Sequence, residues 1–247
     1  MLAEKRMEVI LAELAAQRAV SVTHLCQVTG ASEATIRRDL NTLARQRRLT
    51  KVHGGAVIIE EEFRVAEPDM EVKRRLYTQE KERIARHAAA LIDGGDVVFL
   101  DAGSTVLGMA EHLAGTQALF VTNNIECAFR LMERGLRTYV LGGPLKPGTM
   151  SVAGAETMES LRRYNFTKAF IGVTGITIAQ GFTTPDPEAA AMKALAASRA
   201  QSVYVLADSS KFGKVTAALV FPLETACIIT DSLPDQRYLD CTEVSVV

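Results

Sequence analysis

Hydrophobic positions in the first part of the chain recur at helical spacing in three short segments. The first covers residues 2–17 and the second covers residues 22–29. Ser21 is suited to cap the second segment, and Gly30 tolerates the positive φ with which helices often end. The third segment runs from Ser32 to about residue 46. Two short helices joined by a glycine-containing turn predict a helix-turn-helix.

The third segment has one apolar and one polar face. At about 100° per residue, Ile36, Leu40 and Leu43 fall within a narrow arc and are expected in the core. In this motif the second helix enters the major groove with its N-terminal residues leading. Asp39 is expected to orient an arginine or to support packing rather than to touch DNA. The candidates for operator contacts are Ser32, Thr35, Arg37, Arg38 and Asn41.

Residues 45–58 alternate polar and apolar positions around Gly54 and Gly55, which predicts a β-hairpin, a wing beside the helices. Charges on an isolated amphipathic helix usually form only a solvated face. Here the turn, the outward arginines and the basic hairpin agree with one another, so the pattern favours DNA binding over that alternative. The candidates for phosphate contacts in the wing are Arg47, Lys51 and His53.

The rest of the chain alternates short apolar runs with helical patterns. Apolar runs with helices between them predict a parallel α/β sheet, whose strands are buried on both faces. Residues 59–79 break this rhythm with a proline and mixed charges, which predicts an exposed linker between a head at 1–58 and a body at 80–247. The expected strands are 97–100, 119–121, 138–141, 169–171, 203–206 and 226–229, and the expected helices are 80–92, 125–134, 155–163 and 188–199.

Small polar residues follow nearly every expected strand. Ligands of open α/β sheets bind outside the carboxyl ends of the strands, and exposed N–H groups and hydroxyls there favour anions, phosphate especially. Lys211 adds positive charge, and Asp101 suits sugar hydroxyls. Glycines that serve only turn geometry, and a solvated Lys211, are the alternative. The loops concerned are 101–105, 122–124, 142–144, 172–175 and 208–213.

The charge is distributed unevenly along the chain. The net charge is −1, but residues 1–58 hold nine Lys or Arg and five Asp or Glu, so the head carries +4 and the remainder −5. A small basic head on a larger acidic body indicates two separate tasks.

Composition excludes several classes of protein. With 48% hydrophobic and 23% charged residues, the chain is neither disordered nor a fibrous rod. It has no apolar run long enough to span a membrane and no visible secretory signal, so a cytoplasmic protein is expected. The four separated cysteines indicate reduced thiols, with neither a disulfide framework nor a metal site. The motifs of dinucleotide, P-loop, serine hydrolase and zinc protease sites are missing, so we expect no catalytic residue and no cofactor.

Several motifs resemble the DeoR family of bacterial transcriptional regulators over nearly the whole chain. TIRRDL at 35–40 is followed by HGGA at 53–56, and the body carries DAGST at 101–105, TNN at 122–124, GFTT at 181–184 and DSSKFG at 208–213. The resemblance implies a winged helix-turn-helix that binds operator DNA, usually to repress sugar-metabolism genes. It also implies a sensor domain similar in fold to ribose-5-phosphate isomerase and CoA transferases, which binds phosphorylated sugars.

The same resemblance implies which residues hold the effector. Ser104 stands where threonine is commoner, and Thr167 replaces an acid usually found before Lys168. Within the family, the TTPDPEAA segment and the first six residues are most similar to regulators of fructose operons, whose effector is fructose 1-phosphate. Carried over by position, the effector site comprises Asp101, Gly103, Ser104, Thr105, Thr122, Asn123, Asn124, Gly142, Gly143, Glu188 and Lys211.

Two further expectations follow. A regulator of this kind is expected to form a homo-oligomer, a dimer or tetramer, that reads two-fold symmetric half-sites. The alternative is an enzyme, a sugar-phosphate isomerase with an appended DNA-binding domain, for which Glu188 is the only obvious base.

Overall fold

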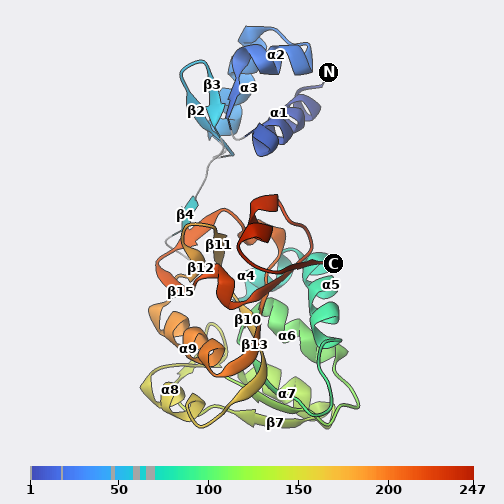
Figure 1. Cartoon of the computed structure of the whole chain (residues 1–247), viewed down its shortest axis with the longest axis vertical. Helices are drawn as coiled ribbons and strands as arrows, with labels where there is room; N and C mark the ends of the chain where they lie inside the picture. The colour runs from blue at the N-terminus through green and yellow to red at the C-terminus, as the bar shows by residue number, and fades with distance from the viewer. Residues whose placement is uncertain (1, 18, 46–47, 58–61, 65–69) are drawn as a thin grey trace. The chain divides into compact units, whose positions relative to one another are not determined.

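The computed structural model describes residues 2–17, 19–45, 48–57, 62–64 and 70–247 (Figure 1). The chain divides into two compact units, residues 1–62 and 63–247. Each unit has hydrophobic clusters of its own, since Ile10, Leu25 and Ile36 pack together in the first, while two clusters lie in the second.

The first unit is a winged helix-turn-helix, as predicted. A three-stranded antiparallel sheet in the order β1-β3-β2 lies against three helices. Ser21 caps α2 by accepting from the N–H of His24 at 3.1 Å, and Gly30 ends it at φ +68°. Strand β1 was not predicted, because three residues are too few to show alternation. The elements are α1 (Ala3–Gln17), β1 (Ala19–Ser21), α2 (Val22–Thr29), α3 (Glu33–Arg45), β2 (Thr50–Val52) and β3 (Gly55–Val57).

The second unit is built on a seven-stranded parallel sheet in the order β17-β16-β13-β10-β5-β6-β7. Its outermost strand β17 was missed, but the other six match the predicted runs to within a few residues. The strands are β5 (Val97–Leu100), β6 (Leu119–Thr122), β7 (Arg137–Val140), β10 (Phe166–Gly172), β13 (Ala200–Leu206), β16 (Cys227–Thr230) and β17 (Val244–Val246).

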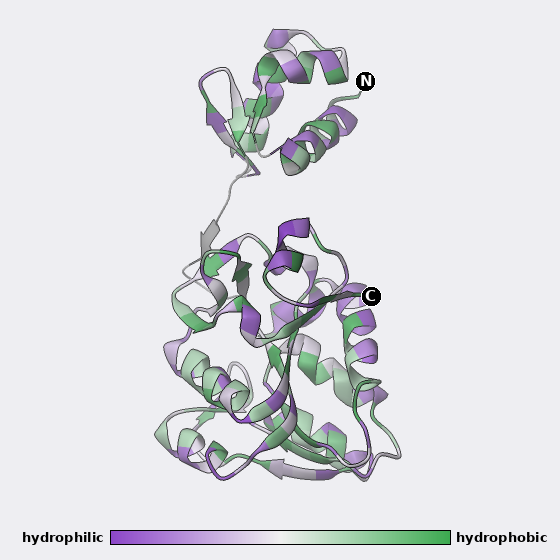
Figure 2. Ribbon diagram, viewed as in Figure 1, coloured by the Kyte–Doolittle hydropathy of each residue, from purple (hydrophilic) through white to green (hydrophobic). Residues whose placement is uncertain are grey.

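Helices cover both faces of this sheet. Along β5, Val98 and Leu100 pack with the helices α5, α6 and α7, whereas Phe99 packs on the opposite face with α8 and α9. In Figure 2 the central strands are mainly hydrophobic, while α5 carries both hydrophobic and hydrophilic residues, as expected of a helix with one buried face. The helices are α5 (Thr78–Ala89), α6 (Ser104–Met109), α7 (Ile125–Glu133), α8 (Ala155–Leu161) and α9 (Pro187–Ser198).

The strand order reverses at β5, which lies between β6 on one side and β10 on the other. The chain runs outward from β5 through β6 to β7, and then returns to β10 and continues outward in the other direction. The connections that follow β5 and β10 therefore lead toward opposite edges of the sheet, and such a switch point opens a crevice at the carboxyl ends of the strands.

Several smaller elements accompany the large sheet. None of these short strands was predicted, because segments of two to four residues show no period. They are a three-stranded antiparallel sheet of β11 (Gly175–Thr177), β12 (Gly181–Thr184) and β15 (Ala218–Phe221), the hairpin of β8 (Leu145–Lys146) and β9 (Ser151–Val152), the pair of β4 (Glu62–Arg64) and β14 (Lys214–Thr216), and short 3₁₀ turns at η1 (Ala110–His112), η2 (Ser209–Lys211), η3 (Leu223–Thr225) and η4 (Gln236–Asp240).

The predicted linker at 59–79 is too long. Residues 70–75 form helix α4 (Met70–Arg75), and α5 begins at Thr78, so this stretch belongs to the second unit. Met70 is buried, and one apolar anchor in a charged segment gave no periodic signal. Within the described ranges, no helix is both long and apolar enough to cross a membrane.

Candidate functional site

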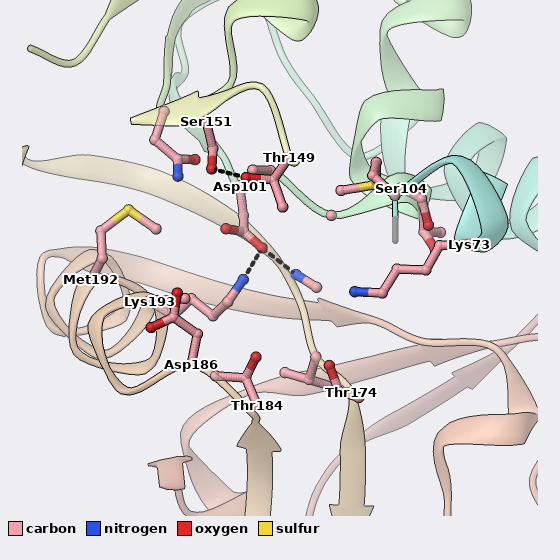
Figure 3. Close-up of a pocket in the computed structure, with 18 of the residues that line it drawn as sticks. Lys73, Asp101, Ser104, Thr149, Ser151, Thr174, Thr184, Asp186, Met192 and Lys193 are labelled. Carbon is pink, nitrogen blue, oxygen red and sulfur yellow. Dashed lines mark hydrogen bonds and ion pairs between the residues drawn. The ribbon is translucent and has the colours of Figure 1, made fainter. Parts of the chain in front are cut away.

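A polar pocket lies at the carboxyl ends of the central strands, where the strand order reverses (Figure 3). Two glycines allow the loops after β5 and β10 to meet there. A Cβ on Gly103 would lie 3.2 Å from the Cα of Gly172, and the N–H of Gly172 donates to Asp101 Oδ2 at 2.9 Å. The residues of the predicted site that line this pocket are Asp101, Gly103, Ser104, Thr105, Asn123 and Lys211.

Buried acceptors occupy the floor of the pocket. Asp101 is 1% exposed, and its Oδ2 forms an ion pair with the buried Lys193 of α9. Asp101 Oδ1 and Asn123 Oδ1 have no hydrogen-bond partner among the described residues. Because buried polar atoms are almost always paired, these two oxygens require donors, which a bound water or a ligand hydroxyl can supply.

Lysines from five separate elements line the same pocket and give it a positive charge. Asp101 and Asp186 are the lining carboxylates among the described residues, and Glu188 and Asp208 pair with Lys146 and Lys211, so the five lysines outnumber these four carboxylates. Lys146 bonds both Asp186 and Glu188 at 2.7 Å, and these bonds raise its pKa. Such a surplus suits a phosphate dianion. The lysines are Lys73 of α4, Lys81 of α5, Lys146 of β8, Lys193 of α9 and Lys211 of η2.

Lys73 has the most perturbed protonation among these lysines. Burial and the neighbouring Lys211 and Lys193 lower its pKa to about 7. Burial likewise lowers the pKa of Lys81, whose ammonium donates to the carbonyl of Lys73. A bound anion would relieve this repulsion.

Helix N-termini contribute less than the sequence indicated. The starts of α7, α9 and η2 are capped by the side chains of Asn124, Asp186 and Asp208, which accept from the N–H groups of Cys127, Glu188 and Ser210. The start of α6 at Gly103 has no such cap. Of these four helix starts, α6 therefore leaves its first N–H groups free of a side-chain cap.

Five residues of the predicted site do not line the pocket. Thr122 is fully buried and donates to the carbonyl of Leu100 at 2.7 Å, so it ties β6 to β5. Asn124 caps α7, as described above, and also donates to the carbonyl of Thr149 at 3.0 Å. The polar groups of Thr122 and Asn124 therefore form hydrogen bonds within the protein that stabilise the fold.

The remaining three have other surroundings. Gly143 has φ +132°, and a Cβ there would lie 2.1 Å from Thr157 Oγ1, so this glycine serves close packing. Gly142 is exposed, with open space around it. Glu188 is exposed and paired with Lys146, which does not favour its role as a base in the pocket.

The sequence reasoning missed most of the cationic side chains in the pocket. Beyond Glu188 in its first turn, α9 carries Lys193 as its one charged residue among apolar ones, which is a signal that such a residue has a buried partner. Lys73 lay in the presumed linker, and no local pattern distinguished it. The lining residues missed include Lys73, Lys81, Lys146, Thr149, Ser151, Thr174, Thr184, Asp186 and Lys193.

The predicted DNA-contacting residues of the first unit lie on α3 and the wing. Lys51 of β2 donates to Asn41 of α3 at 2.8 Å, which joins the two elements. Arg37 bonds Glu33 at 3.3 Å, and the hydroxyls of Ser32 and Thr35 are 3.0 Å apart at the start of the helix. Arg47 lies outside the described residues. The exposed members of the set are Ser32, Arg37, Arg38, Asn41, Lys51 and His53, with Thr35 half-buried.

Asp39 supports packing. It is buried, and its carboxylate accepts from Arg6 of α1 through Nε at 2.5 Å and Nη2 at 3.2 Å. The arginine that Asp39 orients is therefore Arg6 of α1, not Arg37 or Arg38 beside it in the sequence. This contact fixes α1 against α3, the helix that carries the exposed arginines.

Comparison with known proteins agrees with this division. A DeoR-like helix-turn-helix domain model matches residues 6–62, and a DeoR C-terminal sensor domain model matches residues 77–232. The HTH-type transcriptional regulator FruR of Bacillus subtilis (strain 168) is 37% identical over 100% of this chain and 99% of its own. The lactose phosphotransferase system repressor of Streptococcus mutans is 32% identical over 95% of this chain and 94% of its own. Among solved structures, ribose 5-phosphate isomerase A from Methanocaldococcus jannaschii is similar over 53% of each chain, with 18% identity and a TM-score of 0.40.

Proposed function

Because the chain belongs to the DeoR family of transcriptional regulators, we propose that it represses a sugar-metabolism operon and that a phosphorylated sugar sets its affinity for the operator. Its full-length relatives are named as regulators, so the enzyme alternative is set aside. One observation carries the proposal: a pocket with unsatisfied buried acceptors and surplus lysines lies in the same chain as a winged helix-turn-helix.

The two kinds of lining group select the class of ligand. Asp101 Oδ1 and Asn123 Oδ1 call for hydroxyl donors, whereas the lysines call for an anion. A neutral sugar would leave the cations unmatched, and inorganic phosphate offers fewer hydroxyl donors than a sugar does. A sugar phosphate satisfies both. The resemblance to fructose-operon regulators makes fructose 1-phosphate the first compound to test.

The exposed basic residues of α3 and the wing supply the DNA contacts in this proposal. Arg38 sits on the exposed face of α3, and Lys51 reaches the same helix from the wing. Arginine bonds guanine in two places or neutralises a phosphate, and both need an exposed guanidinium. Half-sites related by two-fold symmetry would be read by a dimer or tetramer.

The test is operator binding by the full-length protein with and without ligand. We expect preferential binding to its own promoter over scrambled DNA of equal length, weakening as salt rises. Fructose 1-phosphate should change that affinity roughly 5–150-fold, which is the usual range of coupling, whereas fructose should not. Arg38→Ala should lose operator binding while its melting temperature still rises with fructose 1-phosphate.

Two results would overturn the proposal. One is equal affinity for promoter and scrambled DNA at every salt concentration. The other is a melting temperature and an operator affinity that respond to none of a panel of sugar phosphates.

A further inference from the structure

Helix α4 connects the pocket to the chain segment that leads from the first unit. It is the first described helix of the second unit, and two of its six residues, Met70 and Lys73, line the pocket. Figure 3 shows the Lys73 side chain reaching into the pocket from the side opposite Lys193. A ligand in the pocket would therefore contact α4 directly.

Polar contacts join α4 to α5 and α7. Lys81 donates to the carbonyl of Lys73, and Arg74 pairs with Glu126 of α7. On its outer side, Val72 and Leu76 are about half exposed, so little apolar area is buried there. An element that buries little apolar surface opens more readily than the packed core.

The joint between α4 and α5 stores backbone strain. Tyr77 precedes α5 at φ +55°, the left-handed region that non-glycine residues rarely adopt. Its side chain is about half exposed, so packing compensates for this conformation only in part. A shift of α4 would let Tyr77 relax to an ordinary conformation.

The charges that face Lys73 oppose its docking when no anion is present. Lys211 of η2, Lys193 of α9 and Lys81 of α5 repel it, and Asp101 attracts it. That carboxylate is already paired with Lys193. A ligand phosphate would reverse the balance, because it attracts Lys73 and shields it from the other ammonium groups.

We propose that Lys73 binds the phosphate of the ligand and that α4 is thereby held against the pocket. The charge of the ligand then sets the position of α4, the helix that follows the segment joining the two units. This inference rests on the proposed function and names its regulatory element. A ligand shifts an equilibrium only through contacts that differ between two states, and Lys73 supplies such a contact. A neutral sugar would occupy the acceptors without fixing α4.

The experiment is hydrogen–deuterium exchange of the full chain, read in peptides that cover residues 70–77. With fructose 1-phosphate we expect slower exchange there, and with fructose no change. Lys73→Gln should abolish the slowing of exchange. It should also weaken the effect of fructose 1-phosphate on operator binding about tenfold, which corresponds to the free energy of one charge-assisted hydrogen bond. Lys73→Arg should retain both effects.

Arg75→Gln is the matched control, because Arg75 is an exposed cation on the same helix. It should behave like the wild type in exchange and in operator release. If Lys73→Gln responds to fructose 1-phosphate as fully as Arg75→Gln, the role of α4 is refuted while the proposed function stands. If the wild type itself neither binds nor responds to any sugar phosphate, both fail together.

Discussion

At the scale of single residues, the lysines of the pocket differ in what surrounds them. Lys193 pairs with the buried Asp101, and Lys146 pairs with Asp186 and Glu188, whereas burial and the neighbouring Lys211 and Lys193 lower the pKa of Lys73. Removing Lys193 would leave a buried uncompensated carboxylate, which typically costs about 3–5 kcal/mol of folding free energy. Variants of Lys73 are therefore the cleaner probes of ligand binding.

Proton uptake on binding is a prediction specific to Lys73. Its pKa is about 7 without an anion, so at pH 8 most of it is neutral, and a bound phosphate that raises the pKa must draw in a proton. Affinity for fructose 1-phosphate should therefore fall as pH rises from 7 to 9. Below pH about 6 it should fall again, because the phosphate monoester loses its second charge.

Calorimetry in two buffers of different ionisation enthalpy measures this uptake at pH 8. Lys73→Arg should bind with little proton uptake, because a guanidinium is charged throughout this range. Equal uptake by the wild type and Lys73→Arg would assign the proton to another group.

At the scale of elements, the loop after β7 serves packing. Gly143 has φ +132° and approaches Thr157 of α8, whereas Gly142 beside it has open space around its Cα. Neither lines the pocket. Of the glycine pair that was predicted to be part of an anion site, Gly143 thus lets the loop pack closely against α8.

Alanine at these two glycines separates the two roles. Gly143→Ala should destabilise the second unit by about 1–3 kcal/mol through strain and the clash with Thr157. Gly142→Ala should change stability by less than about 0.5 kcal/mol. Chemical denaturation measures both, and each folded variant should bind fructose 1-phosphate with unchanged affinity. A large loss of affinity without loss of stability in Gly142→Ala would return this loop to the ligand site.

At the scale of the whole molecule, two compact units with separate cores share one chain. Coupling between effector and operator sites typically amounts to about 1–3 kcal/mol. That is smaller than the total stability of an ordinary domain, which is about 5–15 kcal/mol. The two units should therefore unfold as distinct cooperative transitions despite their communication.

Differential scanning calorimetry of the full chain should show those two transitions. Fructose 1-phosphate should raise mainly the melting temperature of the second unit. At a hundred times its Kd, the ligand should stabilise that unit by about 2.7 kcal/mol. Operator DNA should raise mainly the melting temperature of the first unit. A single transition that both ligands shift equally would mean that the chain unfolds as one unit.

The sequence alone determined the features that depend on neighbours along the chain. The cap at Ser21, the glycine at position 30 and the faces of α3 follow from local propensity and a 3.6-residue period. The central strands were legible because strands buried on both faces are continuously apolar. Belonging to a regulator family was legible in TIRRDL and HGGA.

Tertiary structure alone decided which of the polar loops form one site. Asp101 meets Lys193 across 92 positions of the chain, and Gly172 meets Asp101 across 71, contacts that no local period encodes. The reversal of strand order at β5 brings these residues together and sends the loop of Gly143 to α8 instead. Lys73 entered the pocket because Met70 anchors its short helix, a single burial event too small to leave a pattern in the sequence.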